Sequence, residues 1–143
     1  DQFWTNETGR EITPRLVLQE FGTDCMRNGF YDGIWVSLVK QEIINNPENN
    51  YIIPDVRFAN EIKIIKDLGG EVWNVRRGEL PDWWGVAILD NKTNSNLMKT
   101  SYPDVHQSEW RWIGTNDTFN HIIYNDGDTI DTLYSKVSGV LST

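Results

Sequence analysis

The stretch YIIPDVRFANEIKIIKDLGGEVWNVRR, residues 51–77, decides the fold. It opens on a short apolar run, Tyr51–Ile53, which is typical of a buried parallel strand. A helix is expected over residues 60–68, because Gly69-Gly70 is a strong helix stop signal. The segment Glu71–Val75 is expected to form the next strand. The stretch therefore predicts a strand–helix–strand unit, of about the minimum length for a right-handed parallel crossover.

Two helices are expected upstream of this unit. Thr13-Pro14 indicates a helix start, with a hydroxyl at the N-cap and proline at the first helical position. That helix is expected to weaken near Gly22. Apolar spacing predicts a second helix from about Gly33 to Asn45, before the breaker cluster of residues 45–50. Residues 1–12 are polar, and we expect an irregular entry segment there.

Downstream, the pattern breaks and then resumes. Residues 76–118 are polar, carry four tryptophans at positions 83, 84, 110 and 112, and are predicted to form a lid-like or irregular insertion with a small hairpin. The tryptophans could stack on a nucleobase, but a small secondary core under the lid explains them equally well. His121–Tyr124 is expected to be a strand and Thr129–Leu141 a closing amphipathic helix.

These elements predict a single α/β domain over residues 1–143, built on a parallel sheet. Three expected strands are few for a doubly wound domain. We therefore expect the first strand of the sheet to lie outside this sequence, which begins at Asp1 rather than at methionine.

Composition excludes several classes of protein. The net charge of −8 argues against a binding surface for a nucleic acid polymer, which usually needs a basic stripe. The single cysteine, Cys25, excludes an intramolecular disulfide and a cysteine-rich zinc site, and we expect its thiol to be buried. No apolar run is long enough to span a bilayer, so we expect a cytoplasmic protein without a membrane partner.

Charged residues follow the expected strands at the edge where parallel sheets bind ligands. Asp55 and Arg57 follow the first strand, and Arg76 and Arg77 follow the second. The planar fork of an arginine suits a phosphate or the edge of a base. The alternative is that Asp55 caps the next helix and that the arginines form surface ion pairs.

Other patterns carry less weight. His106 and Glu109 are spaced to share a metal on one helical turn, but a solvated loop pair explains them better, and no metal site is predicted. Pro54-Asp55 with Glu61-Ile62-Lys63 imitates a nuclease signature. Glu61 and Lys63 fall within one expected helix, however, where residues two apart point in different directions.

Several segments together resemble the deoxynucleoside monophosphate kinases of tailed bacteriophages. They are TPRLVLQEFGTD (13–24), Trp35, IIPDVRFANE (52–61), KDLGGEVWNVRR (66–77), HQSE (106–109) and YNDG (124–127). Their order and approximate spacing agree along essentially the whole sequence. The resemblance implies a P-loop kinase fold, with ATP and Mg²⁺ as cofactors of the full-length enzyme and transfer of the γ-phosphoryl group to a deoxynucleoside monophosphate.

By this resemblance, Arg15 and Arg57 are the expected catalytic residues that bind the substrate monophosphate. Gly22, Thr23 and Trp35 are expected around the base and sugar, and Asp55, Arg57 and Glu61 are expected to complete the site. The looser candidates for contacts near the phosphates are Arg76, Arg77, His106 and Glu109. A homodimer is left open, and a viral member of the family would lie in the host cytoplasm.

The sequence departs from the family at one decisive motif. The string G-x-x-x-x-G-K-[S/T], whose backbone amides and lysine cradle phosphates, is absent, and no lysine precedes Lys40. We therefore expect an N-terminally truncated kinase that carries the substrate-recognition part and holds no ATP firmly by itself. The alternative is a catalytically inactive nucleotide-binding or structural module derived from a kinase scaffold.

Overall fold

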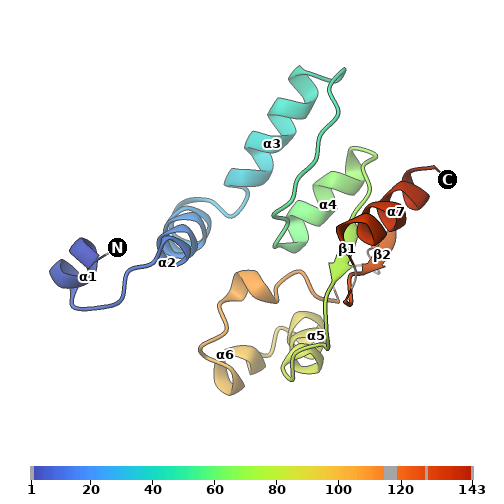
Figure 1. Cartoon of the computed structure of the whole chain (residues 1–143). Helices are drawn as coiled ribbons and strands as arrows, with labels where there is room; N and C mark the ends of the chain where they lie inside the picture. The colour runs from blue at the N-terminus through green and yellow to red at the C-terminus, as the bar shows by residue number, and fades with distance from the viewer. Residues whose placement is uncertain (1, 115–118, 128, 143) are drawn as a thin grey trace.

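The computed structural model describes residues 2–114, 119–127 and 129–142. Helices dominate these residues, and one small sheet lies beside the C-terminal helix (Figure 1). Residues 115–118, at the end of the predicted lid-like region, lie outside the described residues. Within the described part of the chain, no helix is long and apolar enough to cross a membrane.

The first residues form a helix, contrary to the expected irregular segment. Helix α1 covers Gln2–Thr8 and buries none of its residues. It is held by local bonds, among them Thr8 Oγ1 to the Trp4 carbonyl at 2.8 Å. Gly9 ends it at φ +72°, a backbone conformation that glycine adopts without strain. Because the helix buries no residue, the polar sequence of the segment carries no apolar pattern from which it could be predicted.

The predicted start of the next helix is confirmed, and the α-helix ends at Gln19, close to the weakening predicted near Gly22, although the chain stays helical. Helix α2 covers Pro14–Gln19, and the Thr13 hydroxyl caps it by accepting the Leu16 N–H at 3.1 Å. The chain continues without a break into η1, a π-helix over Glu20–Phe30. Thr23 and Arg27 are the buried residues of η1. Their inward contacts offset the cost of about 1 kcal/mol for a glycine within a helix.

The two central helices agree with the prediction to within one residue. Helix α3 covers Ile34–Asn45, and helix α4 covers Ala59–Asp67. They pack against each other, and α3 also contacts η1. Ile62 of α4 is only 1% exposed, and Gly69 follows the helix at φ +80°.

The expected buried strand Tyr51–Ile53 is not formed. The segment is irregular, and Ile52 is 93% exposed. Among the described residues no strand lies alongside it, so its backbone groups have no ladder partners. The apolar run is real, but a strand needs a neighbour to satisfy its N–H and C=O groups.

The sheet has two parallel strands rather than three in the described residues. Strand β1 covers Trp73–Arg76 and β2 covers His121–Tyr124, with Trp73 opposite His121 and Arg76 opposite Tyr124. Helix α7, Ile130–Leu141, contacts β2. Both predicted strands and the predicted closing helix are confirmed, β1 starting two residues late. The protein is α-rich with a small parallel sheet, which is consistent with an α/β kinase-like fold.

The region after β1 is helical, and the hairpin expected within it does not occur in its described part. It contains α5 (Trp84–Thr93), α6 (Leu97–Ser101) and the 3₁₀ turn η2 (Gln107–Glu109). Ala87, Met98, Trp110 and Ile113 form a buried core there, and Trp83, Trp84 and Trp112 pack against it. The tryptophans therefore form a secondary core, the simpler of the two explanations that the sequence allowed.

Candidate functional site

A cavity with a volume of about 670 Å³ lies among α2, η1, α3, α4 and η2. The sequence-predicted substrate residues all line it: Arg15, Gly22, Thr23, Trp35, Asp55, Arg57 and Glu61. Of the looser candidates, Glu109 also lines the cavity. The tertiary structure thus gathers into one space residues from four separate segments of the chain.

Two arginines converge on a single carboxylate at this cavity. Arg57 Nη1 lies 3.2 Å from Glu109 Oε2, and Arg15 Nη2 lies 3.7 Å from Glu109 Oε1. The three side chains belong to α2, to the segment before α4 and to η2. Arg15 and Arg57 remain 71% and 41% exposed, so both guanidinium groups keep donors open to a ligand.

Glu61 holds the backbone of the segment that carries Arg57. Its Oε2 accepts the N–H of Arg57 at 2.7 Å and the N–H of Phe58 at 3.1 Å. The second of these bonds satisfies an N–H at the start of α4, as a capping box does. Burial raises the pKa of the Glu61 carboxyl, while the Arg57 N–H and the charge of Arg27 act in the opposite direction.

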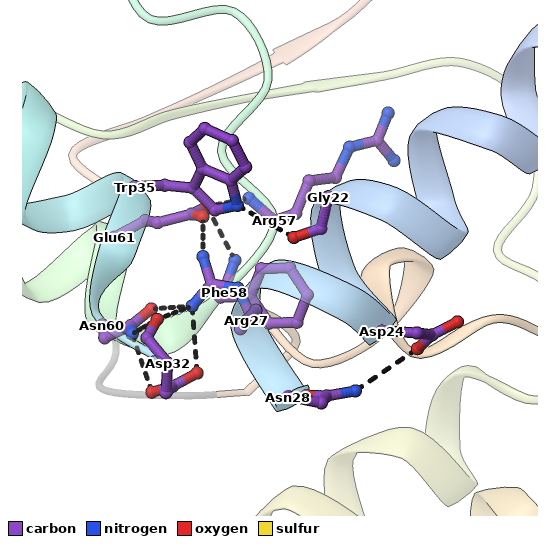
Figure 2. Close-up of polar contacts among 10 residues, drawn as sticks. All are labelled: Gly22, Asp24, Arg27, Asn28, Asp32, Trp35, Arg57, Phe58, Asn60 and Glu61. Carbon is purple, nitrogen blue, oxygen red and sulfur yellow. Dashed lines mark hydrogen bonds and ion pairs between the residues drawn. The ribbon is translucent and has the colours of Figure 1, made fainter. Parts of the chain in front are cut away.

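Arg27 is the residue that sequence reasoning missed. Its side chain is 2% exposed, and it forms an ion pair with Glu61 Oε1. It also donates to the Asp32 carbonyl at 2.8 Å and to Asn60 Oδ1 at 3.0 Å, and its guanidinium lies 3.9 Å from the centre of the Phe58 ring (Figure 2). Its spacing of four residues from Thr23, which the sequence nominated, is a signal that could have found it, because residues four apart lie on one face of a helix.

The wall of the cavity combines aromatic and aliphatic groups. Trp35 Nε1 donates to the Gly22 carbonyl at 2.9 Å, which ties α3 to η1 and fixes the indole ring (Figure 2). Aliphatic and aromatic side chains complete this wall: Leu18, Val36, Leu38, Val39, Ile53, Val56, Phe58, Ile64 and Ile65. Such a wall suits a flat apolar group, and the arginines at the other side suit an anion.

The alternative explanation of Asp55 and the arginines is half right. Asp55 does not cap α4, because Glu61 takes that place, and Asp55 is exposed at the cavity. Of the arginines that follow the expected strands, Arg57 forms an ion pair, with Glu109, as that alternative expected. The rejected nuclease pattern has the geometry that was expected: Glu61 and Lys63 lie in one helix, and Lys63 pairs with Asp67 at 2.5 Å.

Three of the looser candidates do not line this cavity. Arg76 donates to Asn74 at 3.2 Å and lies 5.4 Å from the Trp84 ring and 6.0 Å from the Tyr124 ring. Arg77 is exposed after β1. His106 contacts Ser108 at 2.8 Å and lies 3.7 Å from Asp24. Strand order places both arginines at the sheet edge, but this edge and the cavity are separate in the fold.

Two further expectations concern the thiol and metals. Cys25 is exposed, contrary to the expected buried thiol, because η1 turns Thr23 and Arg27 inward and leaves Cys25 between them on the outside. His106 and Glu109 do not join a third metal-binding side chain: within residues 2–114, 119–127 and 129–142 there is no cluster of three or more histidine, cysteine or acidic groups.

Comparison with known proteins adds a family to this geometry. The family model for deoxynucleotide monophosphate kinase matches residues 2–82, more than half of the 143 residues. The chain belongs to this family. The match to deoxynucleotide monophosphate kinases covers the cavity residues of α2, η1, α3 and α4, and it ends before Glu109.

Two curated relatives support the same assignment. A protein of Acanthamoeba polyphaga mimivirus, named as a deoxynucleotide monophosphate kinase, is 36% identical over 77 residues, which are 46% of this chain and 39% of the relative. The deoxynucleoside-5'-monophosphate kinase of Escherichia phage T5 is 34% identical over 56 residues, 39% of this chain and 22% of the relative. The matched part therefore spans well under half of either relative. No solved structure matches the chain.

Proposed function

We propose that this chain binds the deoxynucleoside monophosphate in a phosphoryl transfer from ATP, and that the cavity between α2, η1, α3 and α4 is the substrate site. The observation that carries the proposal is the convergence of Arg15 and Arg57 in a cavity of about 670 Å³ that also has an apolar wall. Family membership favours this substrate class, since both curated relatives are named for it.

The charges of the site fit a phosphate monoester. Such a group carries a charge of about −1.5 to −2 at neutral pH and offers three acceptor oxygens. Arg15 and Arg57 together supply a charge that a single carboxylate, Glu109, only partly balances. Both guanidinium groups already reach a group of similar size, so the phosphate needs no large movement of either arginine.

The remaining residues take supporting roles in this proposal. Trp35 presents an aromatic surface for the base, as base stacking requires, and Gly22 and Thr23 border the base and sugar. Asp55, at the exposed rim, is placed to accept from a sugar hydroxyl. Glu61 is a positioning residue, because both of its oxygens are already occupied by Arg27 and by the N–H groups of Arg57 and Phe58.

ATP and Mg²⁺ enter the proposal only through the family. In a phosphoryl transfer the protein mainly positions the reactants and stabilises charge. Here Arg15 and Arg57 hold the acceptor phosphate, and Glu61 fixes the segment that carries Arg57. No residue of this chain is assigned to ATP, because the phosphate-loop string is absent from the sequence. The second candidate function is a nucleotide-binding module without catalysis of its own.

Calorimetry with the four deoxynucleoside monophosphates and their nucleosides tests the site. Arg15→Ala and Arg57→Ala should each weaken monophosphate binding by roughly 10- to 100-fold, the effect of a charged hydrogen bond, with little change for nucleosides. If both variants bind the monophosphates as tightly as the parent does, the phosphate binds elsewhere. Absence of monophosphate binding by the parent chain would remove the proposal. A phosphoryl-transfer assay on the same protein separates the kinase from the binding module.

A further inference from the structure

Glu109 occupies the place where the proposed site needs an anion. Its two carboxylate oxygens face different arginines, Oε1 towards Arg15 and Oε2 towards Arg57. Arg57 and Glu109 are 52 residues apart in the sequence, so the contact depends on how η2 is placed against the α4 entry segment. Figure 2 shows the Arg57 side chain extending away from the Arg27–Glu61 pair, which leaves its guanidinium free for this contact.

The segment that carries Glu109 is held against η1 by further polar contacts. Gln107 Nε2 donates to Asp24 Oδ1 at 3.4 Å, and His106 Nε2 lies 3.7 Å from Asp24 Oδ2. Ser108, between them and Glu109, is buried and lines the cavity. Residues 106–109 therefore form one bridge across the cavity from the secondary core to α2 and η1.

We propose that Glu109 is an internal competitor of the substrate phosphate: in the ligand-free chain its carboxylate occupies the Arg15–Arg57 anion site, and the incoming monophosphate displaces it. The inference rests on the proposed role of the two arginines. It adds a regulatory contact from a part of the chain beyond the segment matched by the family, residues 2–82.

Charge decides the direction of the exchange. A phosphate monoester carries more negative charge and more acceptor oxygens than a carboxylate, so it displaces Glu109 from the two arginines when it is present. The contact with Glu109 nevertheless lowers the apparent affinity, because only the fraction of molecules with an open site is competent to bind. Glu109 would keep the two arginines together when no substrate is bound, and would raise the monophosphate concentration at which half of the molecules are occupied.

The substitution Glu109→Gln tests this role, because it keeps the size of the side chain and removes its charge. Glu79→Gln, in the same region and exposed, is the matched control. Calorimetry should show the deoxynucleoside monophosphates binding about three- to tenfold more tightly to Glu109→Gln than to the parent. The corresponding nucleosides, which lack the phosphate, should bind both proteins equally, and Glu79→Gln should match the parent throughout.

The outcomes separate the two proposals. If the parent binds monophosphates, and Glu109→Gln binds them equally or more weakly at an equal melting temperature, the competitor role is overturned. The proposed substrate site is then unaffected. Tighter binding of nucleosides as well as monophosphates also overturns it, since the effect would not then act through the phosphate. If neither protein binds any monophosphate, the substrate site fails and the competitor fails with it.

Discussion

Arg27 and Glu61 form a buried ion pair that joins η1 to α4 across 34 positions of sequence. The same Glu61 carboxylate accepts the N–H of Arg57, so the pair fixes the backbone of a residue proposed to hold the substrate phosphate. Asp32 and Asn60 also accept hydrogen bonds from the Arg27 guanidinium. The cavity proposed to bind the substrate thus depends on a polar network in its lining.

Arg27→Met should destabilise the protein by about 3–5 kcal/mol, because it leaves the half-buried Glu61 carboxylate without its partner. Lys63→Met is the matched control on α4. It removes an exposed pair with Asp67, and its cost should be below about 1 kcal/mol. Urea unfolding at neutral pH measures both. Equal losses in the two variants would contradict the structural importance of the buried pair.

Glu61 should give stability a distinctive pH dependence. Burial raises its pKa in the folded chain above the unfolded value of about 4.3, so the folded state binds this proton more readily. Its contribution to stability is fully present below the unfolded pKa and is lost as the pH rises through the folded pKa. The unfolding free energy of the parent minus that of Glu61→Gln should therefore fall as the pH rises from below the unfolded pKa of Glu61 to above its folded pKa.

Glu20, which pairs with Arg10, is a control of opposite sign. A hydrogen bond from Arg10 lowers the pKa of Glu20, so its contribution is present above the unfolded pKa and is lost as the pH falls. The parent minus Glu20→Gln difference should rise with pH. Chemical unfolding at a series of pH values measures both differences. A rise for Glu61 as well would mean that Arg27 outweighs burial in setting its pKa.

Asp90 should be essential to the secondary core. It is 1% exposed, and its two oxygens accept the N–H of Asn96 at 3.0 Å and of Met98 at 2.7 Å. Asp90→Ala leaves both donors without an acceptor at the start of α6, which should cost about 1–3 kcal/mol or more. Asp82→Ala, at an exposed position before α5, should change stability by less than about 0.5 kcal/mol. Thermal unfolding with near-ultraviolet circular dichroism of the tryptophans distinguishes the two.

Arg76→Ala should leave monophosphate binding unchanged, although strand order nominates it as a phosphate ligand. Arg76 lies against Trp84 and Tyr124 and does not line the cavity proposed to bind the substrate. Its loss should lower stability slightly, by about 0.5–1 kcal/mol for a cation–π contact. Calorimetry beside Arg57→Ala gives the comparison. A large loss of affinity in Arg76→Ala would place the phosphate at the sheet edge instead.

Local signals in the sequence determined most of the helices and both strands. Thr13-Pro14 marked the start of α2, and Gly69-Gly70 marked the end of α4, because capping hydroxyls, proline and glycine act within one or two turns. Strand β2 was found at its observed bounds. Local signals failed where a partner far away in the sequence is needed: Tyr51–Ile53 has the composition of a strand but no neighbouring strand in the described residues.

The residues of the cavity were nominated by motif resemblance, from pieces scattered between Arg15 and Glu109. The sequence by itself determined their identity and charge, and family membership follows from residues 2–82. Only the tertiary structure decided that Glu109 meets Arg15 and Arg57, that Arg27 lies beneath them, and that Arg76 does not join them. The reason is physical: an ion pair depends on a distance of a few ångströms between atoms, and the packing of helices far apart in sequence sets that distance.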